Sequence, residues 1–131
     1  MVLTKLSPPV MAVALLLAGC GGGTAEREAA GAASEFLAAQ PAQACLRLAP
    51  DTARALERES SAACPEALAA VRFTTDPTPQ GVELAGESAQ VRFADDVVFL
   101  ARFADGWRVT AAGCRRTDPD PAVPYECEVS P

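Results

Sequence analysis

The chain has 131 residues, a length typical of one compact domain. Its 17 Asp and Glu residues outnumber its 11 Lys and Arg residues, for a formal net charge of -6, which disfavours nucleic acid and anionic lipid head groups as partners because like charges repel. The chain contains no histidine, which excludes catalytic sites of the Ser-His-Asp and Cys-His kinds and histidine-ligated zinc.

Residues 1–19 have the layout of an export signal. A positive Lys5 precedes an apolar stretch at 10–17, and the small residues Ala18 and Gly19 follow it. The apolar run is about half of the ~20 residues that a membrane-spanning helix needs. We therefore expect a cleaved signal peptide rather than a permanent transmembrane helix.

Cys20 comes directly after this signal, and the segment LAGC at 17–20 resembles the lipobox of bacterial lipoproteins. The resemblance implies cleavage before Cys20 and lipid on its thiol, which would anchor the protein to the cell membrane on the extracytoplasmic side. Two acyl chains anchor stably where one does so only marginally. Residues 20–23 would form the lipidated cysteine and a flexible glycine linker that reaches only ~10 Å. The alternative is a plain signal peptide with an incidental Cys20.

Lipid on Cys20 would leave an even set of cysteines, Cys45, Cys64, Cys114 and Cys127. Outside the cytoplasm these should form disulfide bonds. Three connectivities exist, and we favour Cys45 with Cys64 and Cys114 with Cys127 because each pair lies within one structural class of the chain. A four-cysteine zinc site would need close C-x-x-C pairs that are absent here, so we predict no metal and no cofactor.

The first half of the domain at 24–131 is predicted to be helical. An alanine-rich helix at 24–39 would be capped by Thr24, with Glu26 and Glu28 in its first turn. Pro41 would start a short helix that includes Leu48 and stops before Pro50. Further helices are expected at 52–59, capped by Asp51, with Ala55 and Leu56 facing inward, and at 65–71.

The second half alternates apolar and polar residues, which predicts β-strands. The expected strands lie at 82–84, 89–93, 97–103, 107–111 and 125–129, with turns at 85–87 and 95–96 and an exposed loop at 115–124. The third should be the longest and central, and Trp107, Val109 and Ala111 should share one side of the fourth. Helices followed by an antiparallel meander predict an α+β fold, with the helices packed on one face of a four- to five-stranded sheet.

Several segments resemble small lipoproteins of high-GC actinobacteria whose domain is NTF2-like, a cone of helices and curved antiparallel sheet. They are LLLAGC at 15–20, ACLRLAP at 44–50, VVFLARF at 97–103, ADGWRVTAAGC at 104–114 and YECEV at 125–129. Enzymes of the NTF2-like class use an Asp, Tyr or His inside the cone. This chain has no histidine, and its single tyrosine, Tyr125, is close to the C-terminus. The resemblance therefore implies architecture rather than mechanism.

Four groups of residues are candidate sites, each with a plainer alternative. Asp95 with Asp96, and Asp118 with Asp120, could serve acid-base chemistry or calcium, but acids at turns and in loops are usually solvated. Arg115 and Arg116 could grip a phosphate or carboxylate, or merely aid solubility. The aromatic residues could line an apolar cavity or simply form the core; they are Phe93, Phe99, Phe103 and Trp107.

The resulting hypothesis is a membrane-anchored lipoprotein with a small extracytoplasmic binding or accessory domain and no identifiable catalytic site. Its partner beyond the membrane would be a cell-envelope protein or a small apolar ligand, contacted through the sheet or the mouth of the cone. The alternatives are a histidine-free NTF2-like enzyme acting on a small apolar substrate and a purely structural surface protein.

Changing Cys20→Ser should abolish lipid labelling and release or misprocess the protein, because serine cannot form the thioether. The fold of residues 24–131 should be unaffected. Metabolic labelling with a palmitate analogue and fractionation of cells test this, and a variant that stays anchored to membranes would refute the lipid assignment.

Overall fold

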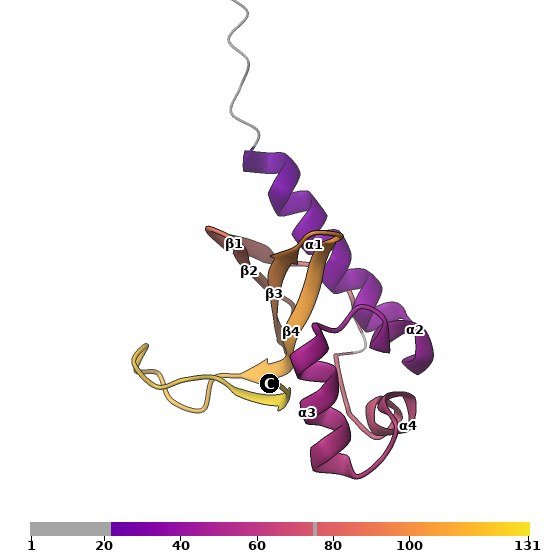
Figure 1. The fold of residues 1–131 in the computed structure, drawn as a ribbon. Helices are drawn as coiled ribbons and strands as arrows, with labels where there is room; N and C mark the ends of the chain where they lie inside the picture. The colour runs from indigo at the N-terminus through magenta and orange to yellow at the C-terminus, as the bar shows by residue number, and fades with distance from the viewer. Residues whose placement is uncertain (1–21, 75) are drawn as a thin grey trace, which may run out of the picture.

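The computed structural model describes residues 22–74 and 76–131, so the expected signal peptide and Cys20 lie outside the described residues. The described residues form four helices followed by five strands (Figure 1). The helices are α1 (Gly22–Ala38), α2 (Pro41–Cys45), α3 (Pro50–Ser60) and α4 (Cys64–Ala69). The strands are β1 (Gly81–Ala85), β2 (Ser88–Arg92), β3 (Val97–Phe103), β4 (Gly106–Arg115) and β5 (Glu126–Val129).

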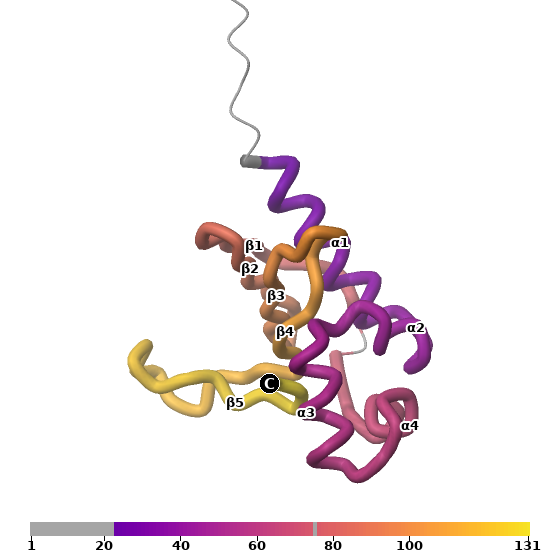
Figure 2. Tube along the Cα trace, in the orientation of Figure 1, coloured from indigo at the N-terminus to yellow at the C-terminus, as the bar shows by residue number. Residues whose placement is uncertain are grey.

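The strands form one antiparallel sheet in the order β1-β2-β3-β4-β5, so each pairs with its neighbour in the chain. Helix α1 lies across β1 to β4 (Figures 1 and 2). Helix α2 contacts α1, α3 contacts β4, and α4 packs against α2 and α3. The predicted α+β fold with helices and an antiparallel sheet is confirmed. Strand β3 is central with the predicted bounds, but β4 is the longest strand.

Helix α1 packs through two alanines and a phenylalanine that lie about one helical turn apart. Ala29, Ala33 and Phe36 are almost completely buried against the sheet, which a spacing of four and three residues allows. The predicted Thr24 cap is wrong, because α1 begins at Gly22 and Thr24 lies inside it. Two of the three expected linker glycines are therefore helical: a first helical turn needs few intrahelical N–H bonds, so glycine costs least there.

Proline is the first residue of α2 and α3 and the second residue of α4, positions that its fixed φ and missing N–H favour. Helix α3 starts at Pro50, so its cap is Ala49 and the predicted Asp51 cap is wrong; Asp51 instead pairs with Arg54 in the first turn. Ala55 and Leu56 are buried, as predicted. Helix α2 ends at Cys45, before the predicted end, because the following residues pair with the sheet.

Those residues cover part of the edge of β4. The N–H of Ala49 donates to the carbonyl of Val109 at 2.7 Å, and the N–H of Val109 donates to Arg47 at 2.9 Å. Arg108 reinforces this contact by donating to the carbonyl oxygens of Leu46 and Leu48. Its bond from Nε to Asp105, 3.1 Å long, lowers the pKa of that carboxyl. The helical half is thus hydrogen-bonded to the sheet.

Strand β4 contains two irregularities that reverse its sidedness. Phe99 pairs with Ala111 but Leu100 pairs with Val109, so the pairing shifts by one residue at Thr110 and again beyond Ala111. Ala111 therefore lies opposite Phe99 on the outer face, whereas Ala112 is fully buried. The prediction that Ala111 shares a side with Val109 is wrong, because strict alternation fails across a bulge.

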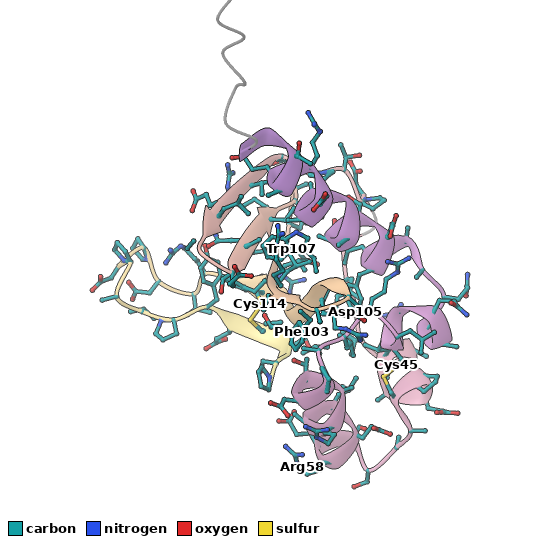
Figure 3. The ribbon with its side chains drawn as sticks, turned by 45° about the horizontal axis from the view of Figure 1, so that its top comes forward. Cys45, Arg58, Phe103, Asp105, Trp107 and Cys114 are labelled. Atoms are coloured by element: carbon teal, nitrogen blue, oxygen red, sulfur yellow. A yellow bond between two sulfur atoms is a disulfide. The ribbon has the colours of Figure 1, made fainter. Side chains whose placement is uncertain are left out.

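Two disulfide bonds link the elements, Cys45–Cys64 between α2 and α4 and Cys114–Cys127 between β4 and β5. These are the pairs that the positions in the chain favoured. Figure 3 shows Cys45 among the short helices and Cys114 in the sheet. Each bond closes a short loop, which in the chain-entropy model stabilises the fold by roughly 3 kcal/mol.

Replacing Cys45 and Cys64 together by alanine should lower the free energy of unfolding by roughly 3 kcal/mol, because the unfolded chain regains the closed loop's freedom. Urea denaturation measures this. Peptide mapping of the unreduced protein is the control, and a peptide joining Cys45 to Cys114 or Cys127 would contradict the pairing.

Candidate functional site

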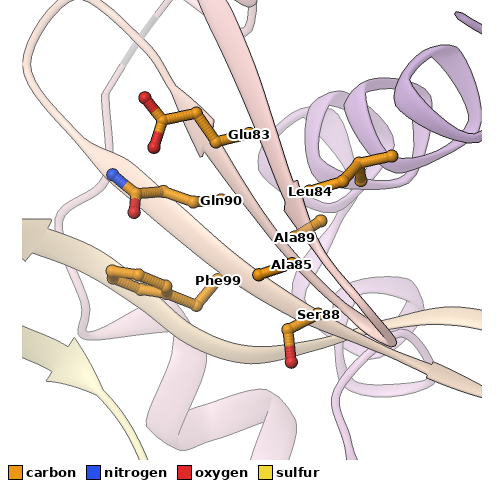
Figure 4. A pocket seen from close by; sticks show the side chains of 7 residues that line it. All are labelled: Glu83, Leu84, Ala85, Ser88, Ala89, Gln90 and Phe99. Atoms are coloured by element: carbon orange, nitrogen blue, oxygen red, sulfur yellow. The ribbon is translucent and has the colours of Figure 1, made fainter. Parts of the chain in front are cut away.

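The outer face of the sheet, opposite the helices, presents a row of side chains across three strands. Glu83 on β1 pairs with Gln90 on β2, which pairs with Phe99 on β3. Figure 4 shows these three side chains projecting on the same side, whereas Leu84 points toward the helices. Alternation along the strands explains the arrangement, because successive residues point to opposite faces.

A hollow of about 240 Å³, which we call the hairpin hollow, lies at the β1–β2 hairpin beside this row. It is lined by Glu83, Leu84, Ala85, Ser88, Ala89, Gln90 and Phe99 (Figure 4). The lining is largely apolar and its small residues leave the space open. Glu83 puts a negative charge at one side. A small apolar group fits this lining.

Tyr125, which precedes β5, stands next to the hairpin hollow. Its hydroxyl accepts a hydrogen bond from Gln90 Nε2 at 3.2 Å. Its ring meets the Phe99 ring edge to face, with centroids 5.3 Å apart. The guanidinium of Arg116 also lies over the Tyr125 ring, 4.4 Å from its centroid, in a cation–π contact. Tyr125 therefore connects the outer face of the sheet to a cation.

A second, shallower depression lies beyond Tyr125, and we call it the arginine hollow. It has a volume of about 520 Å³. Its lining consists of Arg92, Phe93, Ala94, Asp95, Asp96, Val97, Cys114, Arg115, Arg116 and Tyr125. Three arginines thus line one depression in an acidic protein, together with Asp95 and Asp96. Guanidinium groups bind phosphate and carboxylate through paired N–H donors.

Asp96 is the one buried carboxylate among the described residues, with a residue exposure of 2 %. Its Oδ2 accepts a hydrogen bond from the Thr74 N–H at 2.6 Å, and its Oδ1 lies 3.4 Å from Arg115 Nη2. It therefore joins the segment after α4 to β4. The prediction that Asp95 and Asp96 are both solvated turn residues is wrong for Asp96, because the tertiary fold buries it with one hydrogen-bond donor, Thr74, and one cation, Arg115.

The other predicted residues are spread over the molecule. Asp118 and Asp120 are exposed and accept hydrogen bonds from backbone groups of their own loop. The four aromatic residues do not share a cavity: Phe93 is in the core, Phe99 is on the outer face, Phe103 is exposed, and Trp107 packs partly against the core under Arg102. No cluster of potential metal ligands occurs within residues 22–74 and 76–131.

The alternating pattern of the sequence did not identify Gln90 or Arg92 as site residues. Alternation along 88–92 places both on the outer face, but only the pairing register shows that Gln90 neighbours Phe99. Arg92 lines the same hollow as Arg115 and Arg116 because the sheet places the end of β2 close to the end of β4, with β3 between them. Neither contact has a signal in the local sequence.

The chain matches no protein-family model, no curated protein and no solved structure. In the part of the chain that the structure describes, no helix is both long and apolar enough to cross a bilayer. Function must therefore be argued from the chemistry of the outer face.

Asp96→Ala should lower the free energy of unfolding by about 1–3 kcal/mol, because it leaves the Thr74 N–H without its acceptor. Asp96→Asn should cost less, since its amide oxygen can still accept from Thr74. Urea denaturation measures both. Asp95→Ala is the matched control at an exposed turn residue and should change stability by less than about 0.5 kcal/mol. Equal effects of the two alanine variants would contradict the structural role of Asp96.

Proposed function

We propose that this protein is a lipid-anchored, extracytoplasmic binding module with an NTF2-like arrangement of helices and sheet. It binds a small ligand with an apolar part on the outer face of its sheet, without a catalytic step. Lipid on Cys20 holds the module at the membrane, with at most a very short tether, because α1 begins two residues after it.

The observation that carries this proposal is the hairpin hollow. The space between the helices and the sheet is filled by the core, which includes Phe36, Leu48 and Leu100. The opposite face carries a largely apolar depression with Phe99 at its side. Ligand sites are typically concave and apolar with a few polar groups that set orientation, and here Gln90, Ser88 and Glu83 supply those groups.

The arrangement of Asp96 favours binding over catalysis. This carboxylate lines the arginine hollow and is the natural candidate for a general base. Its side chain has no exposed surface, however, and its oxygens already face Thr74 and Arg115. A general base must reach the proton that it removes. Asp96 therefore supports Arg115 rather than acting on a substrate.

Ala85→Trp should weaken binding of a small apolar probe at least tenfold, because the indole fills the hairpin hollow. The probe is 1-octanol, titrated into the full chain carrying Cys20→Ser and followed by amide chemical shifts. In the parent chain we expect saturable shifts confined to 83–90 and 99, with a Kd in the millimolar range or tighter.

Ala69→Trp is the matched control, because Ala69 is also an exposed alanine but ends α4, among the helices. It should leave the affinity for 1-octanol unchanged. Shifts that spread over the whole chain, or equal loss in both variants, would contradict a site at the hairpin hollow.

A further inference from the structure

We propose that the ligand is an amphipathic anion, whose oxyanion, a phosphate or carboxylate, is bound in the arginine hollow while its apolar part lies in the hairpin hollow. This inference rests on the proposed function and specifies the chemical class of the ligand.

Two arginines of the arginine hollow have no carboxylate partner. Among the described residues, Arg92 and Arg116 form no ion pair, and Arg115 pairs only with the buried Asp96. An acidic chain has many carboxylates available to pair with arginine. The Arg116 guanidinium, held on Tyr125 beside the depression without such a partner, is suited to an external oxyanion.

These side chains are held in place by their neighbours. Arg116 stacks on Tyr125, which Gln90 and Phe99 fix in turn. The Cys114–Cys127 disulfide ties together the strands that precede Arg115 and follow Tyr125. Ordering flexible side chains is a major cost of binding, so guanidinium groups that are already held bind an anion more tightly.

Gly81 leaves room for the side chain of Arg92. The Arg92 guanidinium lies directly over Gly81 on the neighbouring strand, where any Cβ would collide with it. The glycine therefore leaves room for the long side chain to lie across β1. The guanidinium therefore rests over β1, on the side of β2 away from β4, and it must turn about its side-chain bonds to reach an anion beside Arg115 and Arg116.

The two hollows meet at Tyr125. Gln90 and Phe99 line the hairpin hollow, and both contact Tyr125, which lines the arginine hollow. One ligand can therefore extend from one hollow to the other. Glu83, at the hairpin end, repels an anion and so favours the orientation with the oxyanion toward the arginines.

The arginine hollow lies away from the start of α1. It is built where β4 ends and the loop to β5 begins, and Figure 1 shows this end of the sheet far from the first turn of α1. Lipid on Cys20 would place that first turn nearest the membrane. The hollow would then face away from the membrane, which favours a free ligand over a lipid head group of the same bilayer.

The test compares matched probes on the full chain carrying Cys20→Ser, with affinities taken from amide shift titrations at low salt. The probes are octyl phosphate, octanoate, 1-octanol, inorganic phosphate and phosphatidylglycerol vesicles. We expect octyl phosphate or octanoate to bind at least tenfold more tightly than both 1-octanol and inorganic phosphate. Whichever of the two binds more tightly identifies the preferred oxyanion.

Arg92→Gln with Arg116→Gln should remove this advantage and reduce the affinity for the better anion at least tenfold, while leaving that for 1-octanol unchanged. The matched control, Arg58→Gln with Arg72→Gln, removes the same charge from exposed arginines elsewhere and should have less than a threefold effect. Amide spectra establish that each variant is folded. Arg116→Lys, which keeps the charge but loses the planar fork, should fall between parent and double variant.

Equal affinities for 1-octanol and both anions would overturn the inference but leave the proposed function standing, because the hairpin hollow would still be occupied. Inorganic phosphate binding as tightly as octyl phosphate would overturn the single amphipathic ligand. Vesicles that bind as tightly as the best anion, with the same arginine dependence, would overturn the free ligand in favour of a lipid head group. Absence of binding by every probe would overturn both proposals.

Discussion

The edge of β4 is the constraint on which the rest of this structure depends. A strand edge carries N–H and C=O groups that must be paired, covered or left to water. Here one part of the edge is bonded to residues 47–49 and another to β5. Thr52 adds a bond from its hydroxyl to the carbonyl of Thr110 between them. Helical and β halves are thereby joined along one strand.

Because two segments share that edge, they also determine which residues of β4 and β5 lie on the outer face of the sheet. The pairing shifts within β4 change which face its later residues present. Gly113, with a φ of 64° and Glu128 too close for a Cβ, allows the shift. Beyond it, Cys114 is bonded to Cys127 and Tyr125 is brought over Phe99. Irregular backbone in one strand thus positions Tyr125, the residue at which the two hollows meet.

The uneven distribution of charge on this protein suits its proposed location at the membrane. The net charge of -6 keeps the chain off anionic membrane surfaces, so lipid rather than electrostatic attraction would hold it there. Against that background, the arginine hollow is weakly cationic, because its lining has three arginines and two aspartates. A local field of opposite sign to the whole molecule directs anions to one place on the surface.

The sequence by itself determined the class of fold, the bounds of β3 and the inward face of α3, because these follow from local periodicity. The cysteine positions likewise favoured the pairs that the structure contains. The helix caps at Thr24 and Asp51 were predicted wrongly, since each helix continues one or two residues beyond the best local cap. Only the tertiary structure decided the site. The burial of Asp96, the sidedness of Ala111 and the contact of Gln90 and Phe99 with Tyr125 depend on register and on bulges. These bring together residues whose local patterns are independent.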